Sequence, residues 1–208
     1  MKVFESLDAH LRDRARELQR TKAEGGKIVG YFPGGYMPEE IILACGAVPV
    51  GLHRGGEHEP VMVAGAYQPR WLDTFCRAQI GYKALGGEPF YDLIDLYVVP
   101  ITDNNVRGVA DTWEFYQFGD VFRFGVPHRK TEHALEYFLL GINSLKEKME
   151  ALTGVQITEQ KLSEAIALCN RERELFQELS LMRKSDAPPV TGRDFVKLSH
   201  ASLLADKE

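Results

Sequence analysis

The spacing of apolar positions changes along the chain from short continuous runs to helical periods, and this change predicts an α/β protein. Apolar runs at residues 28–32, 96–99 and 121–125 are typical of buried strands, and a fourth strand is expected at 48–52 or 61–64. The run at 96–99 is continuously apolar, as in a parallel strand that is covered on both faces. We therefore predict a three-layer, Rossmann-like domain with a short, mainly parallel sheet.

Apolar residues at three- and four-residue spacing predict amphipathic helices at both ends of the chain. One helix is expected at residues 3–24, and two long helices are expected over 131–183, which we interpret as an antiparallel hairpin. These elements suggest an N-terminal helix in residues 1–26, an α/β domain in 27–130, and in 131–208 the hairpin followed by the start of a connecting helix.

The segment 27–52 is a strand–loop–helix–strand unit around which the domain is organised. Its loop contains Gly34 and Gly35, and two adjacent glycines allow backbone angles that other residues avoid. Neither a Gly-Lys-Ser/Thr sequence nor a complete GxGxxG pattern is present, so a nucleotide-binding domain lacks its fingerprint. We interpret the loop as a tight strand-to-helix turn that faces a cleft at the carboxyl ends of the strands.

Composition narrows the possible partners. The 208 residues carry a net charge of −5 with a pI near 5.7, which argues against nucleic acid and anionic membranes. Apolar runs are too short for a membrane helix and the N-terminus has no apolar signal core, so a cytoplasmic protein is expected. The three cysteines lie far apart and predict no disulfide framework or zinc site. His53 and His58 are interpreted as exposed loop residues, and no metal site is assigned.

Three separated motifs resemble one known family. They are GYFPGGYMPEEIILACGAVPVGL, YVVPITDNNVRGVADTW, and the helical stretch LTGVQITEQKLSEAIALCNRERELFQELSLMR. In order and spacing they are similar to the 2-hydroxyacyl-CoA dehydratase D-component and benzoyl-CoA reductase family. The likeness covers the chain from about residue 25 onward, and PVGLHRGGEHEPVMVAGAY is most similar to the benzoyl-CoA reductase type.

The resemblance implies a particular chemistry. Members of the family have two α/β domains in a chain about twice this length, with an iron–sulfur cluster held between the domains by cysteine thiolates. An ATP-dependent activator supplies electrons, and the substrate is an acyl-CoA thioester. The resemblance also implies a dimer of two similar subunits, either a homodimer or a heterodimer, and an anaerobic reaction.

This chain does not match the family at the positions of the cluster ligands. The positions that correspond to the family's first two cluster cysteines are Asp73 and Asp103, so this chain is expected to lack its own cluster. An alternative is that the aspartates, with Cys76 as a displaced ligand one helical turn after Asp73, still hold a [4Fe–4S] or related cluster. Otherwise the aspartates are polar or helix-capping residues and Cys76 is a buried apolar one. Cys45 and Cys169, on apolar helical stripes, are predicted to be core residues.

Four other residues are candidates for the site. Glu39, together with Tyr36, lies in the turn that faces the predicted cleft and could transfer protons, although Glu39 also suits the first turn of a helix. Arg77 and Arg107 each follow an aspartate by four residues and could bind the phosphates of CoA or pair with those aspartates. We expect the ion pairs to hold the former cluster pocket shut.

The strand ends near residues 32 and 99 and the helix start near Asp73 are expected at one edge of the sheet. The prediction is that one cleft is lined by Tyr36, Glu39, Asp73, Asp103 and Arg107. Two functions remain open: a subunit of an acyl-CoA reductase or dehydratase system, and a non-catalytic partner that stabilises or regulates a cluster-bearing homologue. A dimer is also expected because Leu198, Leu203 and Leu204 have no later segment to cover them.

Overall fold

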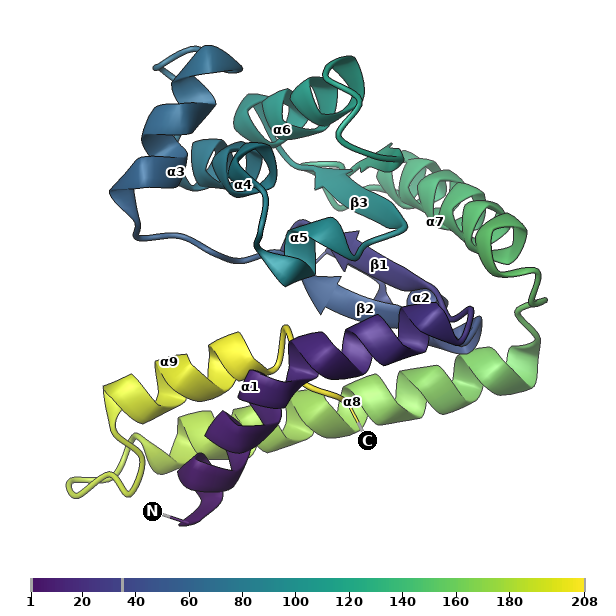
Figure 1. The fold of residues 1–208 in the computed structure, drawn as a ribbon. Helices are drawn as coiled ribbons and strands as arrows, with labels where there is room; N and C mark the ends of the chain where they lie inside the picture. Colours follow the sequence, from purple (N-terminus) through teal and green to yellow (C-terminus); the bar gives the residue numbers. More distant parts are fainter. Residues whose placement is uncertain (1, 35, 208) are drawn as a thin grey trace.

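The computed structural model describes residues 2–34 and 36–207, so the predicted role of Gly35 lies outside the described residues. The described residues form four strands and a series of helices (Figure 1). The strands are β1 (Ile28–Tyr31), β2 (Val48–Gly51), β3 (Leu96–Ile101) and β4 (Val121–Gly125). The helices are α1 (Lys2–Ala23), α2 (Glu39–Ala44), α3 (His58–Val63), the 3-10 helix η1 (Ala64–Ala66), α4 (Thr74–Leu85), α5 (Pro89–Asp92), α6 (Asn104–Phe115), α7 (Glu132–Thr153), α8 (Glu159–Met182) and α9 (Gly192–Ala201).

The four strands form one parallel sheet in the order β2-β1-β3-β4. The predicted parallel sheet is therefore confirmed, and the fourth strand lies at 48–51. The alternative strand at 61–64 is wrong. That segment is helical because its buried positions, Pro60 and Ala64, recur one helical turn apart while Met62 between them is exposed.

Side chains of the central strands alternate between two buried clusters, one on each face of the sheet. In β3, Tyr97 and Val99 belong to the cluster beneath α4 and α6, whereas Leu96 and Val98 belong to the cluster beneath α2 and α7. Because successive side chains of a strand point to opposite faces, this division shows that both faces are covered. The predicted three-layer arrangement is confirmed.

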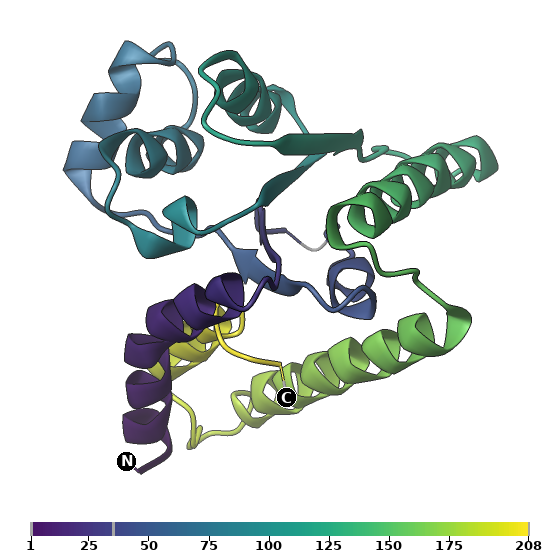
Figure 2. The same cartoon turned by 45° about the vertical axis from the view of Figure 1, so that its right-hand side comes forward.

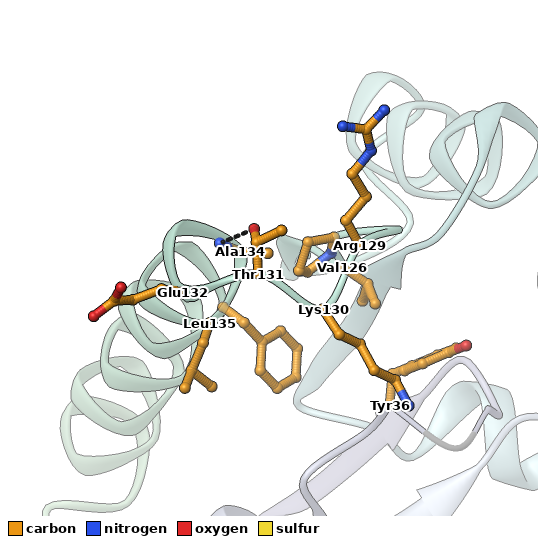
Figure 3. Close-up of a pocket in the computed structure, with 10 residues that line it drawn as sticks. Tyr36, Val126, Arg129, Lys130, Thr131, Glu132, Ala134 and Leu135 are labelled. Carbon is orange, nitrogen blue, oxygen red and sulfur yellow. Dashed lines mark hydrogen bonds between the residues drawn. The ribbon is translucent and has the colours of Figure 1, made fainter.

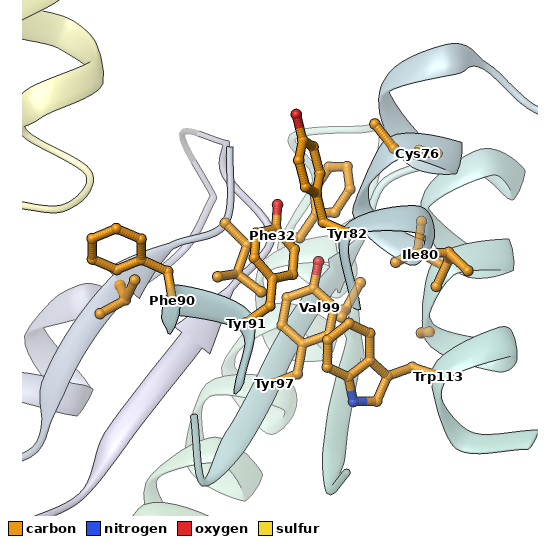
Figure 4. Close-up of a cluster of buried hydrophobic side chains, with 14 of the residues drawn as sticks. Phe32, Cys76, Ile80, Tyr82, Phe90, Tyr91, Tyr97, Val99 and Trp113 are labelled. Atoms are coloured by element: carbon orange, nitrogen blue, oxygen red, sulfur yellow. The ribbon is translucent and has the colours of Figure 1, made fainter. Parts of the chain in front are cut away.

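Aromatic rings dominate the cluster beneath α4 and α6 (Figure 4). Tyr97 lies against Trp113 with a ring-centroid distance of 4.5 Å, and both side chains have no solvent exposure. Tyr82 and Tyr91 stack at 5.6 Å. These rings fix α4, α5 and α6 against the sheet, and the starts of α4 and α6 are thereby held at its carboxyl edge.

The two long helices predicted over 131–183 are present as α7 and α8, and the chain reverses between them. They do not pack along each other, however: α7 packs on β4, and α8 packs on α2. Figures 1 and 2 show that the two helices diverge from their connection with α2 between them. The first half of α7 consequently extends beyond the sheet. Within the described residues, no helix is both long and apolar enough to span a bilayer.

The segment after α9 returns to the sheet. The carbonyl oxygen of Leu203 accepts a hydrogen bond of 2.7 Å from the amide of Gly51, at the end of the edge strand β2. The carbonyl oxygen of Leu204 accepts one of 2.9 Å from Nε of the buried Arg14. Both leucines and Leu198 are half-buried. The prediction that these leucines are uncovered is wrong, because the segment folds back on its own domain.

Candidate functional site at the carboxyl edge of the sheet

The connections after β1, β3 and β4 meet at the carboxyl edge of the sheet. In the observed strand order β2 lies on one side of β1 and β3 on the other, so the chain changes direction across the sheet at this point. Such a switch point is where open parallel sheets place their ligand sites. The polar residues of interest follow β1 and β3 or begin α4, as the sequence predicts.

Asp73 and Asp103 cap the two helices that start at this edge. A side-chain oxygen of Asp73 accepts a hydrogen bond of 2.8 Å from the amide of Cys76, at the start of α4. A side-chain oxygen of Asp103 accepts bonds from the amides of Asn105 (2.7 Å) and Val106 (3.2 Å), at the start of α6. Both aspartates therefore have the capping role that was one of the alternatives from the sequence.

The two caps are joined by Asn105, whose side-chain oxygen accepts a hydrogen bond of 3.2 Å from the amide of Asp73. Phe32, directly after β1, meets Phe75 of α4 with a ring-centroid distance of 5.5 Å. The end of β1 and the starts of α4 and α6 are thus brought together. This part of the predicted convergence is confirmed.

The predicted ion pairs of the aspartates are wrong. The guanidinium of Arg77 donates a hydrogen bond of 2.6 Å to the carbonyl oxygen of Val61, and Nε of Arg77 is buried without a hydrogen-bond partner among the described residues. No ion pair is found for Arg107 in the described part of the chain, and its side chain lines a cavity of about 350 Å³ with Asp111 and Arg123. Four-residue spacing pairs charges only within a helix, whereas each aspartate is a cap turned toward the amides of its own helix.

Cys76 is buried between the caps and the aromatic cluster, with 1% of its surface exposed. Burial raises the pKa of its thiol, and the hydrogen bond and charge of Asp73 and the charge of Asp103 raise that pKa further. Because a thiol binds metal as the thiolate, this position disfavours ligation. Nor do the described residues contain a group of three or more histidine, cysteine and carboxylate side chains that could hold a metal ion.

Glu39 is held by a half-buried charge cluster. Its carboxylate lies 2.7 Å from Nζ of Lys207 and accepts a hydrogen bond from the hydroxyl of Tyr31. Lys207 lies equally close, at 2.7 Å, to the carboxylate of Glu172 on α8. Burial first, and then the charge of Glu39, raises the pKa of Tyr31, so this hydroxyl stays protonated.

Tyr36 is exposed and lines a separate, mainly apolar cavity of about 510 Å³ (Figure 3). The other wall of this cavity is the connection from β4 to α7 and the first turns of α7. The prediction that Tyr36, Glu39, Asp73, Asp103 and Arg107 line one cleft is therefore wrong. Tyr36 and Arg107 line different cavities, and Glu39 is paired beneath α8 with the segment that follows α9.

Two features of this edge were missed from the sequence. Asn105 joins the two caps, although the run Asp-Asn-Asn after a strand is a recognisable signal for a polar loop. The second feature is the pair Arg129 and Lys130, which lies beside the 510 Å³ cavity and follows β4 just as the other candidates follow β1 and β3. Applying the rule of carboxyl-edge loops to β4 would have found it.

These observations define a three-layer parallel α/β protein whose candidate site lies at the carboxyl edge of its sheet. The chain matches the family described as 2-hydroxyglutaryl-CoA dehydratase, D-component, over residues 35–208, and it belongs to that family. The resemblance inferred from the three motifs is confirmed.

Curated relatives agree with this assignment. A benzoyl-CoA reductase subunit of Thauera aromatica is 27% identical over 99% of this chain and 52% of its own length. The beta subunit of lactoyl-CoA dehydratase of Anaerotignum propionicum is 26% identical over 86% of this chain and 47% of its own. The beta subunit of (R)-2-hydroxyglutaryl-CoA dehydratase of Acidaminococcus fermentans is 22% identical over 91% and 50%, respectively. The chain spans about half the length of these relatives.

Proposed function

We propose that this chain acts as a subunit, or part of a subunit, of an acyl-CoA reductase or dehydratase system of the benzoyl-CoA reductase type, and that it holds no iron–sulfur cluster on its own side chains. The names of the relatives support the first statement, since each is a subunit of a reductase or dehydratase acting on an acyl-CoA. The second rests on Asp73 and Asp103, which replace the expected cysteines and serve as helix caps joined by Asn105.

The oxygens of Asp103 are already used by the fold. One accepts the two amide hydrogen bonds at the start of α6, and the other accepts a hydrogen bond of 3.0 Å from the hydroxyl of Thr102. Burial alone would raise the pKa of Asp103, but the bonds from Val106, Asn105 and Thr102 outweigh burial and lower it. The carboxylate is thus ionised and satisfied without a metal ion.

Anaerobic reconstitution with iron and sulfide tests the cluster proposal. The wild type and the variant Asp73→Ser/Asp103→Ser, which keeps two good caps, are expected to take up no stoichiometric iron and to show no absorption near 400 nm. Asp73→Cys/Asp103→Cys is expected to gain iron and colour relative to both. Stoichiometric cluster uptake by the wild type would overturn the proposal, and an uncoloured cysteine variant would contradict the correspondence of these positions to the family's cysteines.

A second candidate function is that of a non-catalytic partner which stabilises a cluster-bearing homologue. The pairing of Glu39 favours it, because this carboxylate is already held in the fold by Lys207 and by the hydroxyl of Tyr31. The two candidates are separated by adding the chain to a cluster-bearing homologue with its ATP-dependent activator and acyl-CoA substrate. A stabilising partner is expected to lengthen the half-life of the homologue and leave turnover per active site unchanged. A catalytic subunit is expected to raise turnover, and Glu39→Gln is expected to abolish that gain.

A further inference from the structure

The 510 Å³ cavity beside Tyr36 has walls that the fold holds in place. After β4, the amide of Val126 donates a hydrogen bond of 3.0 Å to a carbonyl oxygen at the end of β3. Phe138 of α7 lies against Phe124 of β4 with a ring-centroid distance of 5.9 Å, which fixes the first turns of α7. On the other side, Met37 is buried in the cluster beneath α2 and α7 and anchors the turn that carries Tyr36. The cavity is therefore preformed, as ligand sites usually are.

The lining of this cavity is mainly apolar. Its apolar side chains include Tyr36, Val126, Pro127, Leu135 and Phe138 (Figure 3). Leu135 and Tyr36, on opposite walls, are 59% and 55% exposed. A ligand between these two side chains would remove apolar surface from water, which is favourable in proportion to the area covered. The volume lies within the range of about 300–1,000 Å³ that is typical of small-molecule sites.

Lys130 supplies a charge at the cavity. Figure 3 shows that its side chain extends toward Tyr36. Arg129 and Glu132 also border the cavity, but their side chains extend away from it (Figure 3). In the described part of the chain, the ammonium group of Lys130 has no ion pair or hydrogen bond. An apolar cavity with an unpaired cation at one end is complementary to a ligand that has an apolar body and an anionic end.

The kind of anion follows from the single ammonium group. Phosphate dianions are usually bound by the forked donors of arginine or by several backbone amides, and Arg129 extends away from the cavity. One ammonium group balances the one negative charge of a carboxylate. Such a pair at the border of an apolar surface is less weakened by water than a pair on an open surface. The chemistry of the cavity therefore favours a monocarboxylate.

We propose that the 510 Å³ cavity binds a small organic carboxylate, whose apolar body lies between Tyr36 and Leu135 and whose carboxylate group pairs with Lys130. The cavity lies where the chain leaves β4, at the carboxyl edge at which open parallel sheets bind ligands. This proposal depends only on the cavity and its lining. It does not depend on the proposed role of the chain in an acyl-CoA system or on the absence of a cluster.

Titrations of the full chain at pH 7, followed by ligand-observed NMR, test the apolar part of the site. Octanoate is the main probe, and the wild type is expected to bind it with a Kd of at most about 1 mM. Hexanoate, which is shorter by two methylene groups, is expected to bind about four- to fifteenfold more weakly, because less apolar surface is buried.

Two variants separate the charge from the apolar walls, with 1-octanol as the neutral probe of the same length. Lys130→Met keeps an apolar stem and is expected to weaken octanoate at least about threefold while it changes 1-octanol by less than about twofold. Leu135→Asn is expected to weaken both probes. The matched controls Lys184→Met and Leu181→Asn change an exposed lysine and an exposed leucine elsewhere, and neither should alter binding.

A Kd of the wild type for octanoate above about 10 mM would overturn the proposal. An effect of Lys130→Met on octanoate no larger than its effect on 1-octanol would also overturn it, as would unchanged binding in a folded Leu135→Asn variant. Thermal melts show whether each variant is folded, and Tyr36→Ser on the opposite wall repeats the test if Leu135→Asn is not. These titrations contain no iron, sulfide or CoA, so their failure leaves the proposals on the cluster and on the acyl-CoA system untouched.

Discussion

Replacing Lys207 by methionine should show how much the half-buried charge cluster of Glu39, Glu172 and Lys207 stabilises the fold. Nζ of Lys207 lies 2.7 Å from a carboxylate oxygen of Glu39 and 2.7 Å from one of Glu172, so these two oxygens are at most about 5.4 Å apart. Without the cation, two carboxylates at about 5 Å repel by roughly 3 kcal/mol at an effective dielectric constant near 20. Protonating one of them instead costs a similar amount, about 3–4 kcal/mol at pH 7.

Lys207→Met is therefore expected to lower the free energy of unfolding by about 3 kcal/mol at pH 7, and the melting temperature by about 6–12 °C. Lys207→Met/Glu172→Gln removes the repulsion as well as the cation and should recover at least about half of the loss. The matched control is Lys184→Met, at an exposed lysine, which should change the free energy of unfolding by less than about 0.5 kcal/mol.

The stabilisation by Lys207 should depend on pH in a direction set by the pKa of its amine. Burial alone would lower the pKa of Lys207, but Glu39 and Glu172 outweigh it, and the pKa lies above its ordinary value of 10.5. Because the folded-state pKa is the higher one, the stabilisation is complete below about pH 10.5 and is lost as the pH rises through the folded-state pKa.

Urea unfolding followed by circular dichroism at pH 4, 7 and 11 measures these differences. A Lys207→Met variant within about 0.5 kcal/mol of the wild type at pH 7 would refute the reasoning, as would a double variant no more stable than the single one. A difference that stays constant from pH 4 to 11 would show that packing of the lysine stem, rather than its charge, carries the effect.

Three further outcomes are expected from the packing described above. Asp103→Ala should lower the free energy of unfolding in urea by about 0.5–2 kcal/mol through loss of the α6 cap, while Asp103→Ser should cost little. Because the folded-state pKa of Asp103 is lowered, the stabilisation by this carboxylate should be complete above about pH 4 and should fall as the pH drops. Gly81→Ala places a Cβ in collision with the backbone carbonyl group of Pro60 and should cost about 1–3 kcal/mol. Gly108→Ala meets the side chains of Leu72 and Gln68 and should be nearly neutral in the same assay. The three buried cysteines should resist alkylation at pH 8 in the native protein and react only after unfolding, as mass spectrometry would show, because burial raises the pKa of each thiol.

The central strands β1 and β3 were predictable because each is a short apolar run in a parallel sheet with both faces covered. The prediction at 121–125 matches β4 at both ends, and the run at 96–99 is extended only to Ile101. The segment 61–64 shows where this signal fails. Small apolar residues of this kind occur both in strands and in short helices. Only the burial of Pro60 and Ala64 on the same side of the segment reveals the helical period.

Pairing across the sequence was the part that could not be predicted. Four-residue spacing suggested that Arg77 would meet Asp73, but the arginine instead reaches the carbonyl oxygen of Val61 on the neighbouring α3. The contact between Lys207 and Glu39 joins residues 168 positions apart and depends on the return of the chain after α9 to the edge of the sheet. No local pattern encodes such a return, so Glu39 was predicted to face the cleft.

The aspartates show why sequence alone left the cluster question open. A carboxylate after a strand and before a helix can cap the helix or bind a metal, and both roles favour the same residue type at the same position. The structure adds the hydrogen bonds that the carboxylate oxygens already accept. At Asp103 one oxygen accepts the amides of Asn105 and Val106 and the other accepts the hydroxyl of Thr102. These hydrogen bonds make helix capping the observed role of Asp103, and the reconstitution of the cysteine variant tests whether thiolates at the two cap positions bind iron.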